Sequence, residues 1–280
     1  MAPLEDETEG KMNSLDKMLS VLNGFNEDNL MIDVAQAAEL SGSSRASAYR
    51  YLQALTRSGL LTPASGGSYV IGSRVIELEM LKRENDPLLR AARYLIRYYA
   101  DCMGMNIMLC SYYGDKVLCA DNAWPDHSIP EIYKPGRSMP IFKGAMAKVI
   151  LANLSPSQLK SIHSWNAERI RESGLGETLE AFLARMAEIR SAGVTITQGE
   201  VVDGLVGIAA PIRDGEERVL GSVVFVLSIE HFNSLERDAL AQEIRHIASE
   251  IEHGILRASK FAATAPTAAA RPRRVPVYRG

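Results

Sequence analysis

Four arginines lie in a stretch of the chain that contains no Asp or Glu: residues 41–74 hold Arg45, Arg50, Arg57 and Arg74. The whole chain has 280 residues and a formal net charge of -3. A segment without carboxylates inside an acidic protein suits a polyanionic partner, because each acidic side chain would repel phosphate groups. The placement of these arginines therefore indicates binding to a nucleic acid.

Two short helices separated by a Gly-containing turn are expected to position the first two of these arginines. Asp33 caps the first helix, and Ser43 or Ser44 caps the second by accepting a hydrogen bond from a free backbone N–H. The polar residues of the second helix cluster near its start, where a recognition helix reads base edges. Its buried face is predicted from an apolar stripe at helical spacing, formed by Ala48, Leu52 and Leu55.

A β-hairpin, or wing, is predicted after the second helix, because two short apolar segments at residues 60–62 and 69–71 flank a Gly-rich turn. The complete order predicts a winged helix-turn-helix. The alternative is an unrelated helical bundle that ends in a hairpin, with its Ser and Arg side chains merely solvated. We expect contacts with double-stranded DNA from Ser43, Ser44, Arg45, Ser47, Tyr49, Arg50, Gly67 and Ser68.

Over residues 12–257 the chain resembles the IclR family of bacterial transcription regulators. The segments that carry the resemblance are SLDKMLSVL, AQAAELSGSSRASAYRYLQALTRSGLL, YVIGSRVIEL, PGRSMPIFKGAMAKVILANLS and GEVVDGLVGIAAPIRDGEERVLGSVVFVLS. The resemblance implies a winged helix-turn-helix followed by an α/β sensor domain that binds a small molecule and supports oligomerisation. Two departures limit it: Ala46 and Tyr49 stand where members often have Ser and His, and Val224 and Val226 stand where some members place effector-binding serines.

The expected fold class is α+β, with an N-terminal winged helix-turn-helix and a C-terminal GAF-like α/β effector-binding domain. The expected divisions are a disordered arm at 1–11, the DNA-binding domain at 12–73, a linker helix at 74–86, the effector domain at 87–257 and a disordered basic tail at 258–280. The linker helix either carries movement between the domains or is a passive spacer. The effector domain is expected to contain strands at 106–112, 116–122, 194–197, 206–212 and 219–227, a short helix after Ser155 and a long last helix at 235–256.

An effector site is predicted where a helix begins at Gly144. The first N–H groups of a helix are free and its dipole favours an anion, although an ordinary capped helix end is the alternative. The resemblance implies that the amides of Ala145 and Met146 hold the carboxylate of the effector. An apolar wall should then bind the body of a small aromatic or hydrophobic acid rather than glyoxylate or pyruvate. The predicted site comprises Met139, Gly144, Ala145, Met146, Thr197, Leu205, Gly207, Val224 and Val226.

Several other functions lack sequence support. The chain contains no nucleophile elbow, P-loop or dinucleotide fingerprint, so we expect neither an enzyme nor a cofactor. The five histidines form no metal-ligand cluster, and the three cysteines are expected to be reduced thiols, with a redox switch as the alternative. No apolar run reaches the ~18 residues of a membrane span, and the acidic N-terminus does not resemble a signal peptide. We therefore expect a cytoplasmic protein.

The sequence as a whole predicts a sequence-specific transcriptional regulator that binds a palindromic operator as a homodimer or homotetramer. A repressor of a catabolic operon, released by a small carboxylate effector, is favoured over an activator. The competing hypothesis is a metabolite-binding protein or enzyme whose winged domain does not bind DNA.

Overall fold

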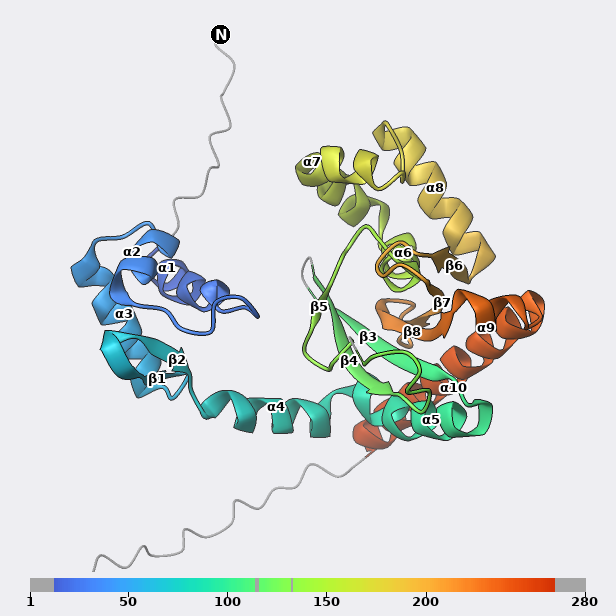
Figure 1. Cartoon of the computed structure of the whole chain (residues 1–280), viewed down its shortest axis with the longest axis horizontal. Helices are drawn as coiled ribbons and strands as arrows, with labels where there is room; N and C mark the ends of the chain where they lie inside the picture. Colours follow the sequence, from blue (N-terminus) through green and yellow to red (C-terminus); the bar gives the residue numbers. More distant parts are fainter. Residues whose placement is uncertain (1–12, 114–115, 132, 265–280) are drawn as a thin grey trace, which may run out of the picture. The chain divides into compact units, whose positions relative to one another are not determined.

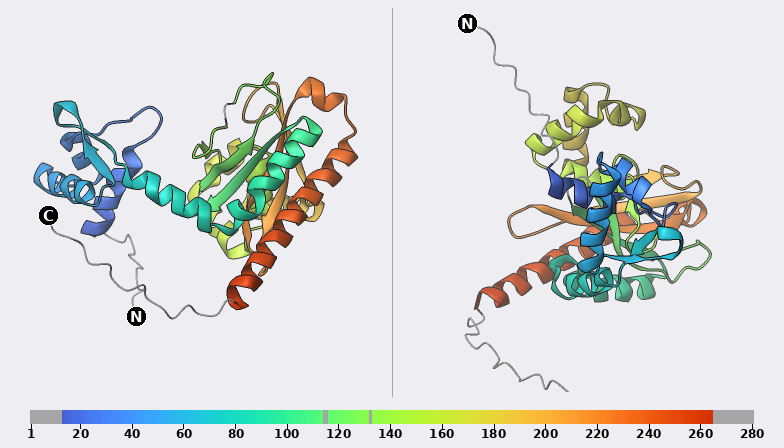
Figure 2. Two further views of the ribbon diagram at one scale, coloured as in Figure 1. Left: turned by 90° about the horizontal axis from the view of Figure 1, so that it is seen from below. Right: turned by 90° about the vertical axis from the view of Figure 1, so that its left-hand side faces the viewer.

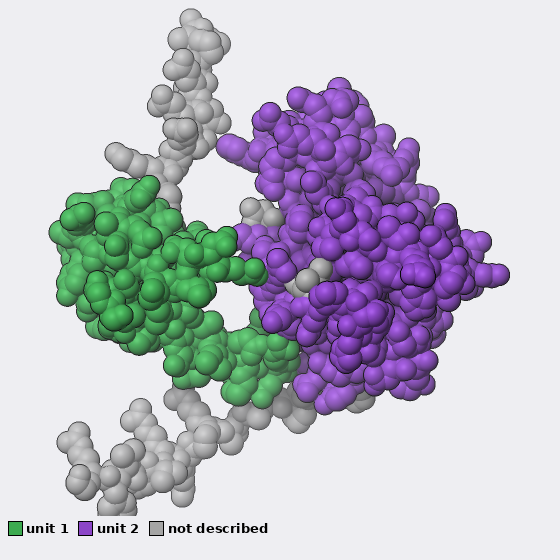
Figure 3. All heavy atoms as spheres, viewed as in Figure 1, with its two compact units in different colours: residues 1–85 green, residues 86–280 purple. Residues whose placement is uncertain are grey.

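The structure is a computed structural model that describes residues 13–113, 116–131 and 133–264 (Figure 1). The chain separates into two compact units, Met1–Asn85 and Asp86–Gly280 (Figure 3). The arm predicted at residues 1–11 lies outside the described residues, as does the predicted tail beyond residue 264. Positions 258–264 were predicted to be disordered but form the end of a helix, because alanine-rich sequence continues as far as Pro266 before a helix-breaking residue occurs.

The first unit is a helix-turn-helix with a wing, as predicted. Its small core contains the predicted stripe of the recognition helix, and Leu61 pairs with Ile71 across the wing. Tyr69 also exchanges two backbone hydrogen bonds with Ile32, which ties the wing to the segment directly before Asp33 and α2. The elements are α1 (Ser14–Ser20), η1 (Val21–Gly24), α2 (Val34–Leu40), α3 (Arg45–Arg57), β1 (Leu61–Pro63), η2 (Ser65–Gly67), β2 (Tyr69–Ile71) and α4 (Arg74–Asn85).

The last helix of this unit, α4, has no buried residue. Intrahelical ion pairs join Arg74 to Glu77 and Arg83 to Glu79. Five large apolar side chains nevertheless remain exposed on it, namely Val75, Ile76, Leu78, Met80 and Leu81. A helix with this much uncovered apolar surface is typical of a partner-binding element rather than of a solvated spacer.

The second unit is built on one six-stranded antiparallel sheet in the order β5-β4-β3-β8-β7-β6. The α+β prediction is therefore confirmed. The strands are β3 (Asn106–Tyr113), β4 (Lys116–Ala123), β5 (Ser138–Met139), β6 (Thr195–Gln198), β7 (Leu205–Arg213) and β8 (Val219–Ser228).

Helices cover both faces of this sheet (Figures 1 and 2). Alternate residues of each strand point to opposite faces, so Phe225 packs under α5 and α10 while its neighbours Val224 and Val226 pack under α6. The helices are α5 (Pro87–Met103), α6 (Ala145–Ala152), α7 (Pro156–Glu172), α8 (Leu179–Ala192), α9 (Ile229–Asn233) and α10 (Arg237–Thr264).

Two helix predictions need correction. The helix that begins after Ser155 is not short: α7 has 17 residues, because Ser155 and Gln158 form a capping box and Pro156 occupies the first turn. The expected start of the last helix at residue 235 is also wrong. A separate short helix, α9, is capped by Ser228, and α10 begins only at Arg237.

Candidate DNA-binding and ligand-binding sites

The start of α3 presents exposed polar side chains on a helix whose opposite face is buried. Ser44, not Ser43, is the cap, and its Oγ accepts a hydrogen bond from the backbone N–H of Ser47 at 3.2 Å. The Ser47 hydroxyl in turn accepts a hydrogen bond from Nη2 of Arg50 at 3.1 Å. Arg45, Tyr49 and Arg50 are all exposed. This chain of contacts orients one guanidinium before any partner binds.

Ser43 has a different role from the predicted cap. Its backbone N–H donates to the carbonyl of Ala38 at 3.0 Å, and its hydroxyl lies 2.7 Å from that of Ser41. Lys17 on α1 adds a hydrogen bond to the carbonyl of Gly42 at 3.3 Å. The turn between α2 and α3 is therefore fixed from both sides, which sets the direction in which α3 leaves it.

The tip of the wing contains the two predicted wing residues, Gly67 and Ser68. Gly66 and Gly67 have positive φ angles of 70° and 77°, and both are exposed. The N–H of Ala64 donates to the carbonyl of Ser68 at 2.8 Å and closes the turn. An exposed backbone without bulky side chains can approach a phosphate group closely.

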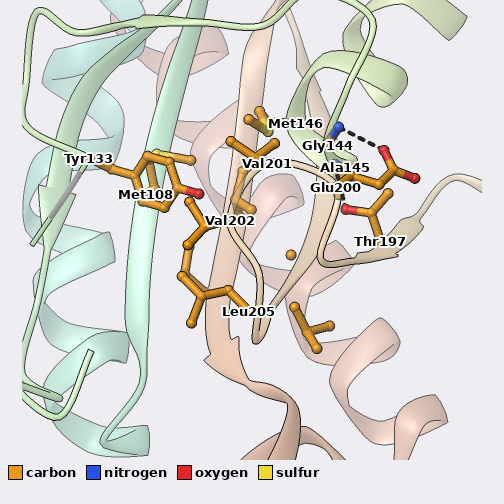
Figure 4. Close-up of a pocket in the computed structure, with 14 residues that line it drawn as sticks. Met108, Tyr133, Gly144, Ala145, Met146, Thr197, Glu200, Val201, Val202 and Leu205 are labelled. Carbon is orange, nitrogen blue, oxygen red and sulfur yellow. Dashed lines mark hydrogen bonds between the residues drawn. The ribbon is translucent and has the colours of Figure 1, made fainter. Parts of the chain in front are cut away.

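A small cavity of about 30 Å³ lies between α6, the sheet and the β6–β7 turn (Figure 4). Every residue predicted for the effector site lines it except Met139, which is buried in β5 opposite Val117. The sequence prediction missed Tyr133, Val201, Val202 and Val206. Met108 and Glu200, which are not among the predicted site residues, also line the cavity.

The first amides of α6 are already hydrogen-bonded within the chain. The N–H of Ala145 donates to Oγ1 of Thr197 at 3.0 Å, and the N–H of Gly144 donates to Oε2 of Glu200 at 2.9 Å (Figure 4). The other carboxylate oxygen of Glu200 accepts from Nζ of Lys148 at 2.6 Å. The amide of Ala145, predicted to hold an effector carboxylate, therefore bonds to a threonine hydroxyl in this structure.

Gly144 and Gly207 are both predicted site residues, but their local geometry differs. Gly144 has a φ of 81°, and a Cβ there would lie 2.7 Å from Sδ of Met146. A Cβ on Gly207 would meet Ala145 and Thr197 at 3.5 and 3.6 Å, which is ordinary contact. Glycine is therefore required at 144 by backbone and space alike, whereas at 207 it leaves open volume beside the cavity.

The opposite wall is apolar apart from one phenol. Burial raises the pKa of Tyr133, so its hydroxyl stays protonated at neutral pH and can donate a hydrogen bond. Its ring lies 6.1 Å from that of Trp124. The segment that brings Tyr133 to the cavity has neither the helical nor the strand periodicity of apolar residues. Nothing in its sequence therefore indicates that Tyr133 lies at the cavity. Val201 and Val202 did carry a signal, since they are apolar residues in a turn bounded by Gly199 and Gly204.

Three further properties concern the part of the chain that the structure describes. It contains no group of His, Cys, Asp and Glu arranged to hold a metal ion. None of its helices is long and apolar enough to cross a membrane. Cys110 and Cys119 are buried free thiols and Cys102 is an exposed one.

Two family models match this arrangement. The model described as "Bacterial transcriptional regulator IclR C-terminal" matches residues 83–253, and the "IclR helix-turn-helix domain" matches residues 14–64. The chain belongs to the IclR family. IclR proteins are transcriptional regulators, so the chain is a DNA-binding regulator and not an enzyme.

Individual relatives of the IclR family are distant but cover most of the chain. The Pca regulon regulatory protein of Pseudomonas putida is 24% identical over 76% of this chain and 73% of its own length. The DNA-binding transcriptional repressor YiaJ of Escherichia coli is 24% identical over 79% of each chain. The crystal structure of an IclR homolog from Microbacterium hydrocarbonoxydans, complexed with 4-hydroxybenzoate, has a TM-score of 0.69 at 20% identity and covers 88% of this chain and 100% of that one.

Proposed function

We propose that the chain is a repressor that reads a palindromic operator with α3 and the wing. The observation that carries the proposal is the exposed start of α3, where Arg45, Tyr49 and Arg50 project from a helix whose own serine caps it. An arginine side chain can form two parallel hydrogen bonds to guanine or to a phosphate group. The acid-free surroundings favour phosphate. The YiaJ relative, named as a repressor, favours repression over activation.

We further propose that the repressor functions as a homodimer or a dimer of dimers, held in part by α4. Its exposed apolar side chains form a surface that a second copy of the same helix can bury. Two-fold symmetry would present two copies of α3 to half-sites about one helical turn, or a multiple of it, apart. Light scattering at micromolar concentration tests this assembly. A monomeric mass both with and without DNA would contradict it.

The effector that we propose is a small aromatic or hydrophobic carboxylic acid. The genes that the repressor controls would encode the enzymes that degrade this acid. Val224, Val226, Leu205 and Met108 supply apolar contacts for a ring, and the Tyr133 hydroxyl can bind one polar substituent. The complex of the Microbacterium homolog with 4-hydroxybenzoate supports this chemical class.

The effector must enlarge the cavity in order to bind. Its present volume of about 30 Å³ holds roughly one water molecule, whereas ligand pockets usually enclose about 300–1,000 Å³. Val201, Val202 and Leu205 are only partly buried and belong to or adjoin the β6–β7 turn. This turn is the part of the wall that can move while the sheet stays intact.

Operator binding is tested by titrating the protein with palindromic fragments from the promoter of its neighbouring genes at several salt concentrations. The logarithm of the affinity should fall linearly with the logarithm of salt, because each neutralised phosphate releases counterions. One palindrome should bind roughly 10³-fold or more tightly than random DNA. Equal, weak binding to every fragment would support the competing view that the winged domain does not recognise DNA.

The effector site is tested by calorimetry with benzoate, 4-hydroxybenzoate, glyoxylate and pyruvate on the wild type and on Gly207→Ala. The added methyl group meets its neighbours at ordinary contact distance, so the protein should fold and still bind operator DNA. It fills space that the ring needs, so affinity for the aromatic acids should fall by about tenfold or more. Preference for glyoxylate or pyruvate over both aromatic acids would overturn the proposed effector class.

A further inference from the structure

The β6–β7 turn inserts one carboxylate, that of Glu200, beside the cavity. This carboxylate contacts the Gly144 amide with one oxygen and the Lys148 ammonium with the other, at 2.9 and 2.6 Å. The Lys148 side chain is only 10% exposed and that of Glu200 is 32% exposed. A buried ammonium requires a counter-charge, and Glu200 provides it from 52 positions away along the chain.

Glu200 and the lid of the cavity belong to the same short segment. Val201 and Val202 directly follow it and line the cavity. Gly199 and Gly204, with positive φ angles of 67° and 81°, bound the segment. The N–H of Gly199 donates to the carbonyl of Leu205 at 2.8 Å and closes the base of the turn. Glu200, Val201 and Val202 are therefore consecutive residues of one closed turn, so a movement of its backbone shifts all three.

We propose that Glu200 is an intramolecular competitor of the effector: its carboxylate occupies the position that the carboxylate of the ligand takes, and holds the turn closed until it is displaced. This inference rests on the proposed effector site. On binding, the ligand carboxylate takes over the Gly144 N–H and the Lys148 ammonium, and Glu200 moves outward into solvent. Charge is conserved at the ammonium, so the exchange leaves no buried ion unpaired.

The competition imposes a requirement on the ligand. A neutral isostere of the acid cannot displace Glu200, because Lys148 would lose its only counter-ion shown among the described residues. The carboxylate is thus the group that opens the turn, and the apolar body of the ligand fills the space that Val201 and Val202 leave. Recognition of the acid and opening of the turn become a single event.

The experiment compares the full-length wild type with Glu200→Gln, using benzoate and its neutral analogue benzamide in calorimetry. The variant keeps a carbonyl that can accept from the Gly144 amide but leaves the ammonium without a counter-charge. Benzoate should therefore bind Glu200→Gln at least about tenfold more tightly than it binds the wild type. Benzamide should gain nothing. Glu188→Gln, which breaks the exposed pair with Arg185, is the matched control and should leave both affinities unchanged.

If the unpaired ammonium weakens the fold, thermal melting of a second variant, Glu200→Ala, which leaves the same charge unpaired, serves as an independent measurement. Its melting temperature should be lower than that of the wild type. Millimolar benzoate should raise the melting temperature of the variant by more than it raises the melting temperature of the wild type. The additional change Lys148→Met should abolish this excess, because it removes the charge to be neutralised.

The remaining outcomes each decide against the proposal. Equal or weaker benzoate binding by Glu200→Gln, with measurable binding by the wild type, would show that Glu200 does not compete, while the proposed effector site stands. Absence of benzoate binding to the wild type and to both Glu200 variants would remove the proposed carboxylate effector together with the competition.

Discussion

The two helix starts that face the candidate sites differ in how their first amides are satisfied. In α3 the cap is Ser44, the residue directly before the helix, and the side chains around it are exposed. In α6 the residue before the helix is Gly144, which has no side chain, and the caps are distant in sequence: Thr197 of β6 and Glu200 of the β6–β7 turn. The cap of α3 is therefore supplied by the adjacent residue. The caps of α6 depend on tertiary structure.

This difference corresponds to the two tasks of a regulator. A DNA-reading surface must be accessible at all times, and a helix that caps itself stays formed while its polar face remains free for a partner. A switch needs two arrangements of comparable free energy. Under the proposed competition, a helix start that is capped in part by a separate turn provides them, because the Glu200 carboxylate can leave and the carboxylate of the ligand can take its place.

The largest expected effect is on the exposed helix start. Arg45→Ala and Arg50→Ala should each weaken operator binding by about 1–3 kcal/mol, and the double variant by roughly the sum if the two contacts are independent. A guanine contact would also relax specificity at one base, whereas a phosphate contact would weaken all fragments alike. Gel-shift titration at fixed salt measures both.

Arg185→Ala is the matched control for these variants, because it removes the same charge from an exposed ion pair on α8. Its operator affinity should equal that of the wild type. Unchanged binding by both Arg45→Ala and Arg50→Ala, in folded protein, would remove α3 as the recognition helix.

The contrast between the two helix starts also explains what could be predicted from the sequence. Ser44, Asp33 and Ser155 each accept from an amide three residues away, so local patterns were enough to place three helices. Gly144 marked the start of α6, but no local pattern links Lys148 to Glu200. Their pairing depends on how the β6–β7 turn packs over α6, which no local period encodes. Tyr133 was missed for the same reason.

The second prediction concerns the distant cap. Thr197→Ala removes the acceptor for the buried amide of Ala145, which should cost about 1–3 kcal/mol because a buried donor is left without a partner. Chemical denaturation followed by tryptophan fluorescence measures the loss, because both tryptophans, Trp124 and Trp165, lie in the second unit. Thr197→Ser keeps the hydroxyl and should recover most of it.

Thr195→Ala is the control, since it makes the same chemical change two residues earlier in β6. The Oγ1 atom of Thr195 is buried and lacks a hydrogen-bond partner among the described residues, so its removal should be neutral or slightly stabilising. If Thr195→Ala destabilised the unit as much as Thr197→Ala, loss of packing rather than loss of a cap would be the cause.

The smallest expected effect concerns the local cap. Ser44→Ala should destabilise α3 by about 1 kcal/mol, seen as faster hydrogen exchange of its backbone amides. The exposed amide of Ser47 can bond to water once Ser44 is truncated, and for this reason the loss should be smaller than at the buried amide of Ala145. The control is Ser43→Ala, because the hydroxyl of Ser43 bonds Ser41 rather than an α3 amide. This variant should leave exchange in α3 nearly unchanged.

A loss of stability in Ser44→Ala that matched or exceeded the loss in Thr197→Ala would show that α3 is not the more self-sufficient of the two helix starts. The proposed division between a permanently formed reading helix and a displaceable ligand-binding one would then fail.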